Sequence, residues 1–210
     1  MKKRFLTILL STAISSTLLL GCQNSKFNLR SRDNKTAKEA TLSSGEWEVG
    51  KDINEGRYTI FSKGDTNNLT ILNPEVEDIS NIYKNVYTIL DEKGKEGVES
   101  ITCNLKKGEV INISGKKQVQ FTPAKKLKDN SKLTSGDWEV GVDIVPGKYK
   151  VKSEKESGNF IILNKDRSKA KVNEILDSNG CNGLKELECE LNDGEIVELR
   201  GVHIVDFERL

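Results

Sequence analysis

The side chains that most often carry chemistry in proteins are scarce in this chain, which has four cysteines and one histidine. Cys103 and Cys189 each have isoleucine or leucine two residues away on both sides, a pattern typical of thiols buried in a core. No nucleophile motif accompanies His203, which we expect to lie exposed on a strand. Zinc-ligand spacings and a glycine-rich phosphate loop are also missing from the sequence, so we expect no metal, no cofactor and no catalytic residue.

A disulfide between Cys181 and Cys189 stays open as an alternative to free thiols. Export of the protein would permit such a bond. Cys181, however, lies in a glycine-rich turn, whereas Cys189 is expected to face the core, so the sequence favours free thiols.

Four aromatic residues are the other candidates for a functional role: Trp47, Tyr58, Trp138 and Tyr149. Exposed on β-modules outside the cell, they would stack against sugar rings or a partner chain. Buried, they would be packing residues of the fold. We favour packing and keep partner binding as the functional alternative.

These aromatic residues belong to a segment that occurs twice. SGEWEVGKDINEGRYTI, residues 44–60, returns 91 positions later as SGDWEVGVDIVPGKYKV, residues 135–151. Beyond residues 74–85 the offset falls to 86, because the second copy lacks five residues of this stretch, and the match then continues to the end of the chain. The chain is therefore one small module written twice.

Each copy predicts an all-β fold. Trp47 and Val49 alternate with polar residues, Asp52 is suited to accept a bond from a backbone N–H two residues on, and Gly56 permits positive φ. Short strands separated by Gly and Asn/Asp turns indicate a β-sandwich or a small barrel. The predicted strands are 46–49, 57–62, 69–72, 86–90, 100–105, 110–114 and 118–122, then 137–140, 148–153, 159–163, 171–176, 185–191, 195–199 and 202–207.

The N-terminus has the pattern of a secretory signal. Lys2, Lys3 and Arg4 precede an uncharged apolar run, which ends in Leu-Leu-Gly-Cys at residues 19–22. This ending resembles the lipobox of bacterial lipoproteins. The resemblance implies cleavage before Cys22, a diacylglycerol on the Cys22 sulfur and a further acyl chain, such as palmitate, on its amine. It implies a lipid-anchored protein on the extracytoplasmic face of the cell membrane.

The sequence thus divides into five predicted parts: a signal peptide (1–21), a lipidated cysteine with a flexible tether (22–42), a first β-domain (43–122), a linker (123–134) and a second β-domain (135–210). Counting charged residues gives +3 for residues 23–42 and +3 for the linker, against −3 and −5 for the two β-domains. Acidic domains lack the basic face that nucleic acids require, so we expect no nucleic-acid partner.

The shared pattern Trp-x-Val-Gly-x-Asp-Ile-x-x-Gly-x-Tyr resembles small repeated β-domains of exported proteins and lipoproteins of Gram-positive bacteria. The resemblance implies secretion, repetition and an all-β fold, and it implies no activity. We therefore expect a non-enzymatic binding or adaptor module for a protein or a cell-envelope glycan. The alternative is an enzyme, or an accessory subunit of a surface enzyme or transport complex, with its site in the cleft between the domains.

Overall fold

A computed structural model of the chain describes residues 27–74, 82–127 and 129–210. Its regular structure is β-strand apart from one 3₁₀ turn, Ile82–Lys84, which confirms the all-β prediction. The predicted signal peptide and Cys22 lie outside the described residues. None of the described segments forms a helix long and apolar enough to cross a membrane.

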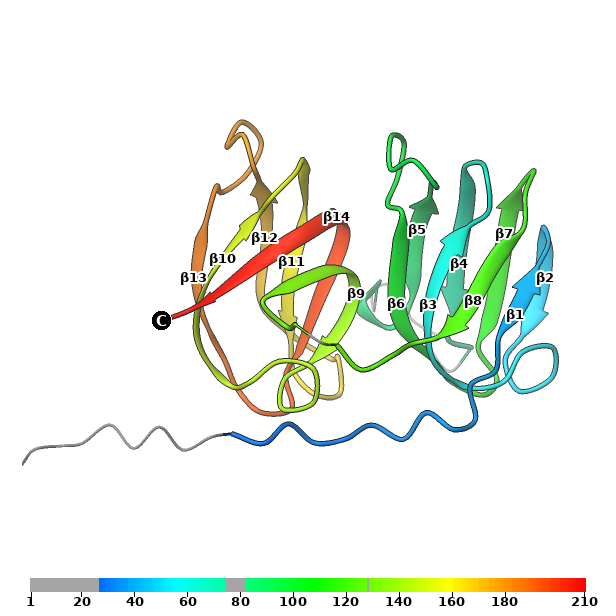
Figure 1. Cartoon of the computed structure of the whole chain (residues 1–210), viewed down its shortest axis with the longest axis horizontal. Helices are drawn as coiled ribbons and strands as arrows, with labels where there is room; N and C mark the ends of the chain where they lie inside the picture. The colour runs from blue at the N-terminus through cyan, green and yellow to red at the C-terminus, as the bar shows by residue number, and fades with distance from the viewer. Residues whose placement is uncertain (1–26, 75–81, 128) are drawn as a thin grey trace, which may run out of the picture.

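The first copy of the module, here called the first repeat, forms two facing layers of antiparallel strands (Figure 1). One layer has the order β2-β7-β4-β5, and the other has the order β1-β8-β3-β6. The strands are β1 (Ala40–Leu42), β2 (Gly45–Glu48), β3 (Gly56–Ser62), β4 (Asn67–Leu72), β5 (Val86–Leu90), β6 (Ser100–Leu105), β7 (Val110–Gly115) and β8 (Val119–Pro123).

The second repeat reproduces these pairings with fewer, longer strands. Its strands are β9 (Lys132–Glu139), β10 (Gly147–Ser153), β11 (Ser157–Leu163), β12 (Ala170–Asp177), β13 (Leu187–Leu191) and β14 (Ile196–Arg209). β9 pairs with both ends of β14, with a register shift between Leu199 and Ile204, so these two strands take the places of β1–β2 and β7–β8. The register is shared residue by residue: Tyr58 lies opposite Cys103, and Tyr149 lies opposite Cys189.

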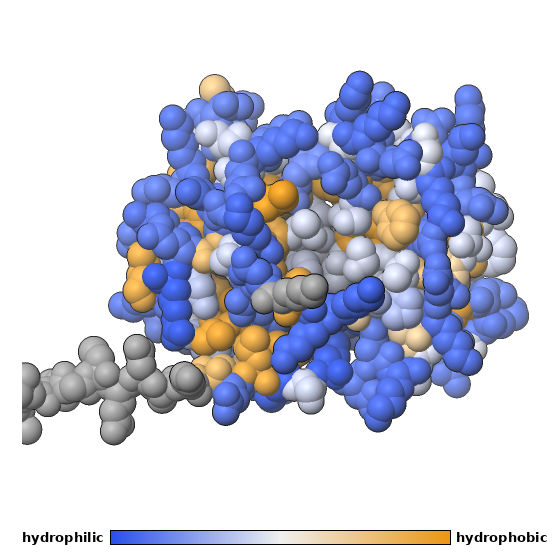
Figure 2. All heavy atoms as spheres, viewed as in Figure 1, coloured by the Kyte–Doolittle hydropathy of each residue, from blue (hydrophilic) through white to orange (hydrophobic). Residues whose placement is uncertain are grey.

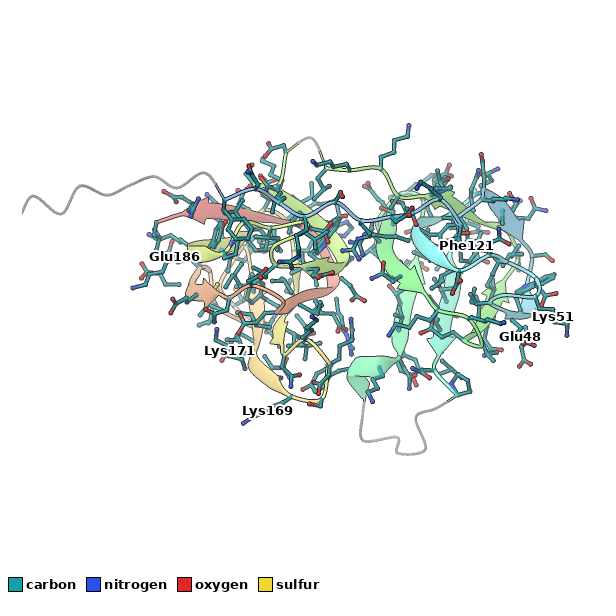
Figure 3. The ribbon with its side chains drawn as sticks, turned by 90° about the horizontal axis from the view of Figure 1, so that it is seen from below. Glu48, Lys51, Phe121, Lys169, Lys171 and Glu186 are labelled. Atoms are coloured by element: carbon teal, nitrogen blue, oxygen red, sulfur yellow. The ribbon has the colours of Figure 1, made fainter. Side chains whose placement is uncertain are left out.

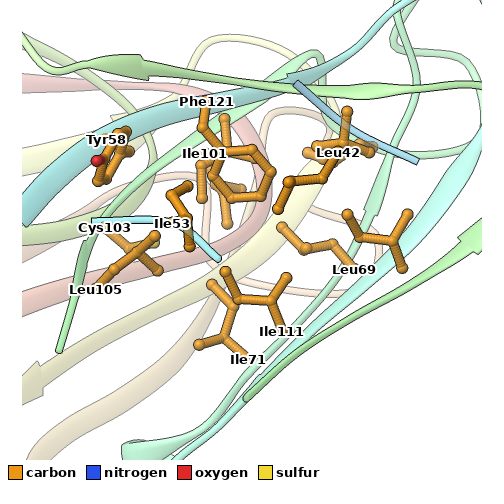
Figure 4. Packing of buried hydrophobic residues seen from close by; sticks show 14 of the residues in the cluster. Leu42, Ile53, Tyr58, Leu69, Ile71, Ile101, Cys103, Leu105, Ile111 and Phe121 are labelled. Carbon is orange, nitrogen blue, oxygen red and sulfur yellow. The ribbon is translucent and has the colours of Figure 1, made fainter. Parts of the chain in front are cut away.

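Each repeat supplies its own hydrophobic cluster. In the first repeat, Tyr58, Ile60 and Phe121 are fully buried among branched aliphatic side chains (Figure 4). The Tyr58 and Phe121 rings meet edge-on at 6.2 Å between centroids, and Tyr149 and Phe207 repeat this contact at 6.1 Å. Burying such side chains is the main stabilising term in folding. The predicted domain boundaries stay a prediction, because hydrogen bonding continues from one repeat into the other.

The two repeats join where β6 and β9 lie side by side and parallel (Figure 1). Thr102 and Gly136 form the bridge. The space for this approach exists because residue 136 is glycine: a Cβ atom there would lie 2.1 Å from the Thr102 carbonyl oxygen. The equivalent Gly45 has no such neighbour, since its Cβ would come no closer than 3.8 Å to another atom.

Two short strand segments were not among those predicted. Ala40–Leu42, placed in the tether, form β1 against residues 119–121 of β8. Lys132–Thr134, placed in the linker, form the first part of β9. Both stretches are only three residues long, which is too short for an alternating pattern to show in the sequence.

The part of the predicted tether that precedes β1 runs along the second repeat before it enters the first (Figures 1 and 3). The Arg30 amide donates to the Gly141 carbonyl at 2.8 Å, and the Arg57 amide donates to the Asn34 side-chain oxygen at 2.7 Å. This stretch therefore contacts both repeats, and we call residues 27–39 the N-terminal segment.

The corner that follows β2 and β9 is closed by an aspartate, but in a different way from that expected. The Asp52 carboxylate accepts a bond from the Glu48 N–H at 2.9 Å, and Asp143 accepts one from the Glu139 N–H at the same distance. The bond thus reaches back four residues instead of forward two. The reason is that Gly50 and Gly141, with φ near +90°, fold the chain back over the strand end.

Candidate functional site

A crevice of about 540 Å³ lies between the two repeats. The first repeat supplies one wall, from β4, β5 and the turn at residues 95–98, and the second repeat supplies the other. Clefts between structural units are common positions for binding sites. The residues that the argument below uses are Asn68, Thr70, Tyr87, Ile89, Glu156 and His203.

The first-repeat wall exposes large apolar side chains. The Tyr87 and Ile89 residues of β5 are 54% and 41% exposed, whereas Leu90 beside them is fully buried. Among the described residues, β5 is the last strand of its layer, and Val98 forms an isolated bridge with Leu90 at the end of β5. Apolar side chains next to polar ones on an edge strand are typical of a surface that contacts a partner. Asn68 and Thr70 of the adjacent β4 supply the polar groups.

The second-repeat wall contains the single histidine. Only 8% of the His203 side chain is exposed, and its Nε2 lies 3.1 Å from a Glu156 carboxylate oxygen. A Cβ atom on Gly94 of the first repeat would lie 2.7 Å from His203 Cε1. The prediction of an exposed strand histidine is therefore wrong, because the turn at Gly94 covers the ring. Glu156 has φ 61°, a strained conformation for a residue other than glycine.

The four aromatic residues considered for partner binding do not line this crevice. Tyr58, Trp138 and Tyr149 are at most 5% exposed, and Trp47 is half-buried against the first core. Their polar atoms bind backbone carbonyls four residues earlier: Trp47 to Ser43, Tyr58 to Asn54, Trp138 to Thr134 and Tyr149 to Val145. These contacts support the packing interpretation, because they leave three of the four residues almost no surface for a partner.

The three described cysteines are free thiols, so the structure contains no Cys181–Cys189 bond. Burial raises the pKa of Cys103 far above its ordinary value and that of Cys189 to about 11. Both thiols are therefore protonated and unreactive at neutral pH. In the described part of the chain, no three His, Cys, Asp or Glu side chains converge to hold a metal ion.

Charged groups are buried where the repeats meet, below the crevice. Arg167 binds Asp137 at 2.8 Å and also pairs with Glu198, while its Nε donates to the Tyr83 carbonyl of the first repeat at 2.6 Å. Glu198 pairs in addition with Arg200. Burial, and then the neighbouring Asp137 carboxylate, raise the pKa of Glu198 to about 7 against the opposing effect of the two arginines.

The raised pKa of Glu198 predicts a pH dependence of stability. Between its ordinary pKa and about 7, the folded chain holds a proton on Glu198 that the unfolded chain has lost. The proton on Glu198 therefore stabilises the folded state. This stabilisation is complete below the ordinary pKa and is lost as the pH rises through about 7. Between pH 5 and pH 8 the free energy of unfolding should therefore fall in the parent protein. The fall should be about 1–3 kcal/mol larger than in Glu198→Gln.

Urea unfolding of both proteins at the two pH values measures this difference. Glu208→Gln, an exposed carboxylate on the same strand, serves as the control and should keep the parent's pH dependence. Equal pH dependence in the parent and Glu198→Gln would contradict the prediction.

The crevice residues were not predicted from the sequence, although one signal was available. Aligning the copies places Tyr87 opposite Asn173 and His203 opposite Lys117. A residue type that occurs in only one of the two copies is not required by the fold that they share. Tyr87 and His203, which both line the crevice, are two such positions.

Comparison with known proteins adds no family to this description: the chain matches no protein-family model, and no curated protein sequence matches it significantly.

Proposed function

We propose that the protein is a lipid-anchored, non-enzymatic binding module on the extracytoplasmic face of the cell membrane, with its partner bound in the inter-repeat crevice. The observation that carries the crevice assignment is the exposure of Tyr87 and Ile89 beside polar side chains of both repeats. An aromatic ring with amide, hydroxyl and carboxylate neighbours suits a sugar chain or an extended peptide. The partner is thus a cell-envelope glycan or protein.

The anchor part of the proposal is supported by Leu-Leu-Gly-Cys at the end of the apolar run. Cys22→Ala should remove fatty-acid labelling and release the protein from the membrane fraction, because no acceptor sulfur remains. Cys181→Ala, which removes an exposed thiol of the second repeat, is the matched control and should label like the parent. Labelling that persists in Cys22→Ala would refute the anchor.

The crevice part is tested by paired substitutions at equivalent positions. Ile89 and Ile175 occupy the same place in the two repeats and are 41% and 42% exposed, but only Ile89 lines the crevice. Binding of the purified chain to isolated cell envelopes, before and after protease treatment, separates a protein partner from a glycan. Tyr87→Ala and Ile89→Ser should weaken binding about tenfold or more, and Ile175→Ser should not. Equal binding by all three would refute the assignment.

One observation favours the enzyme alternative: Glu156 pairs with His203 on the crevice wall and has a strained backbone. A carboxylate that orients a histidine is an arrangement used in general base catalysis. If isolated envelopes release soluble fragments when incubated with the protein, and His203→Gln abolishes this release, the alternative holds. If no fragments appear while binding is retained, the binding function stands.

A further inference from the structure

A second hollow, of about 120 Å³, lies between the N-terminal segment, the linker, β3 and the turn that follows β9. We call it the cationic pocket, because its lining includes five basic side chains and a single carboxylate, Asp143. The basic residues are Arg30, Arg32, Arg57, Lys125 and Lys126. None of them belongs to the inter-repeat crevice.

The carboxylates around the cationic pocket do not balance its charge. Arg30 pairs with Asp193 and, at 3.6 Å, with Glu139. Arg32 Nη2 lies 2.9 Å from one Asp143 oxygen and 3.4 Å from Glu139, and Arg57 Nη2 lies 3.5 Å from the same Asp143 oxygen. Two arginines therefore share one carboxylate oxygen. Counting Glu139 and Asp193 as well, five cations meet three anions. The Asp137 carboxylate also acts on Arg57 but is paired with Arg167.

Two of the arginines that line this pocket each have a guanidinium nitrogen without an acceptor among the described residues. Arg32 Nε and Arg57 Nη1 are buried and without a hydrogen-bond partner among the described residues. The Arg57 side chain is only 6% exposed, and it is held in place by the Asp137 carbonyl and by the Trp138 ring, 5.1 Å from its Cζ. Its burial, with Arg32 nearby, lowers its pKa. An unpartnered buried donor on a charged group is costly, so an acceptor bound to either nitrogen would be stabilising.

We propose that the cationic pocket binds a phosphate group, whose oxygens accept from Arg32 Nε and Arg57 Nη1 while Lys125 and Lys126 neutralise its charge at the rim. Guanidinium groups are the donors best suited to this oxyanion. A third hollow, lined in part by Leu29 and Leu127, adjoins it and shares Lys126, Val142 and Asp143 with it. The phosphate therefore belongs either to a free phosphate ester or to an anionic phospholipid headgroup with apolar atoms attached.

The experiment has one arm for each source and uses the full chain. In the first arm, inorganic phosphate and glycerol 3-phosphate are titrated by calorimetry into the protein in non-ionic detergent. In the second arm, the protein is reconstituted into phosphatidylcholine vesicles with and without phosphatidylglycerol. Hydrogen exchange of the amides in residues 29–34 is followed in both arms, because all of them except Asp33 line the pocket or the hollow beside it.

Two variants and one control connect any binding to the pocket. Arg32→Lys keeps the charge but removes the unpartnered Nε. Lys125→Ala/Lys126→Ala removes two exposed charges at the rim and leaves every buried contact in place. Lys116→Ala/Lys117→Ala removes an equal charge from an exposed loop outside the pocket. We expect affinity to fall about tenfold or more in the first two and to be unchanged in the control.

Saturable binding of the soluble phosphates identifies a free ester as the ligand. Slower exchange with phosphatidylglycerol alone identifies a lipid headgroup. The proposal is overturned if neither arm responds, or if both pocket variants respond like the control.

Discussion

Trp138→Ala should lower the free energy of unfolding by about 3–5 kcal/mol, the usual cost of removing a buried tryptophan. Trp138 is 4% exposed within the second core, its Nε1 donates to the Thr134 carbonyl at 2.9 Å, and Arg57 of the first repeat lies over its ring. A protein of this size has about 5–15 kcal/mol in total. The melting temperature should therefore fall by on the order of 10 °C.

Trp47→Ala is the matched comparison, because Trp47 holds the same position in the first repeat and makes the same bond, to Ser43. Trp47 is only half-buried and has no arginine from the other repeat over its ring, so its loss should cost clearly less. Urea unfolding of the full chain measures both. If Trp138→Ala unfolds like the parent yet binds cell envelopes more weakly, Trp138 is a partner contact and the packing interpretation fails.

Gly136→Ala should separate the two repeats. The Cβ atom of alanine would lie 2.1 Å from the Thr102 carbonyl oxygen and 2.7 Å from the Thr102 nitrogen. Backbone atoms in a strand cannot move aside as a flexible side chain can, so the bridge between β6 and β9 must open. The positive φ of 139° at Gly136 adds strain for any residue with a Cβ.

Gly45→Ala measures the cost of backbone strain without the steric clash that Gly136→Ala has with Thr102. Gly45 has φ 145° but only ordinary contacts around its Cβ position. We expect a loss of about 1–3 kcal/mol in Gly45→Ala, and at least about 2 kcal/mol more in Gly136→Ala. Trypsin should also cut Gly136→Ala faster at Lys125 and Lys126, because the linker is freed when the repeats part. Equal losses in the two variants would show that the β6–β9 contact contributes nothing to stability.

The duplicated architecture was predictable because the sequence carries it twice. An alternation that is ambiguous in one copy, such as that around Trp47, becomes convincing when it recurs around Trp138 at a constant offset. The strand pairing follows the same offsets, since Tyr58 opposite Cys103 and Tyr149 opposite Cys189 are the same contact. The fold of each repeat was therefore accessible without coordinates.

The contacts between the repeats were not accessible in this way, because the offset does not show what the other repeat places beside a residue. Gly45 and Gly136 are equivalent glycines, but only Gly136 lies against Thr102. The outward side chains of β3 begin with Arg57, which is buried between the repeats, whereas the equivalent strand β10 presents Lys148, Lys150 and Lys152. These lysines lie opposite acidic residues of the neighbouring strands β13 and β14. They are on the outside of the protein, as Glu186 is in Figure 3. Most of the face drawn in Figure 2 is likewise hydrophilic.

The sequence does not show that, of two basic residues at equivalent positions, the arginine is buried and the lysine is exposed. Their burial differs because the other repeat covers one position and not the other. For the same reason, the residues that line the crevice and the cationic pocket were not predicted, although a site in the cleft between the domains was considered. Their walls come from segments far apart in the chain, and no local sequence pattern shows that those segments meet.

The N-terminal segment has a consequence for the order of events during biosynthesis. Its arginines bind Glu139, Asp143 and Asp193, and the Arg30–Asp193 contact spans 163 positions. A chain is made from its N-terminus, so these arginines emerge first but meet their carboxylates only after the second repeat has been made and folded. Until then, residues 30–32 stay in solvent while both cores form beside them. A segment that is made before both repeats is thus among the last to take its place.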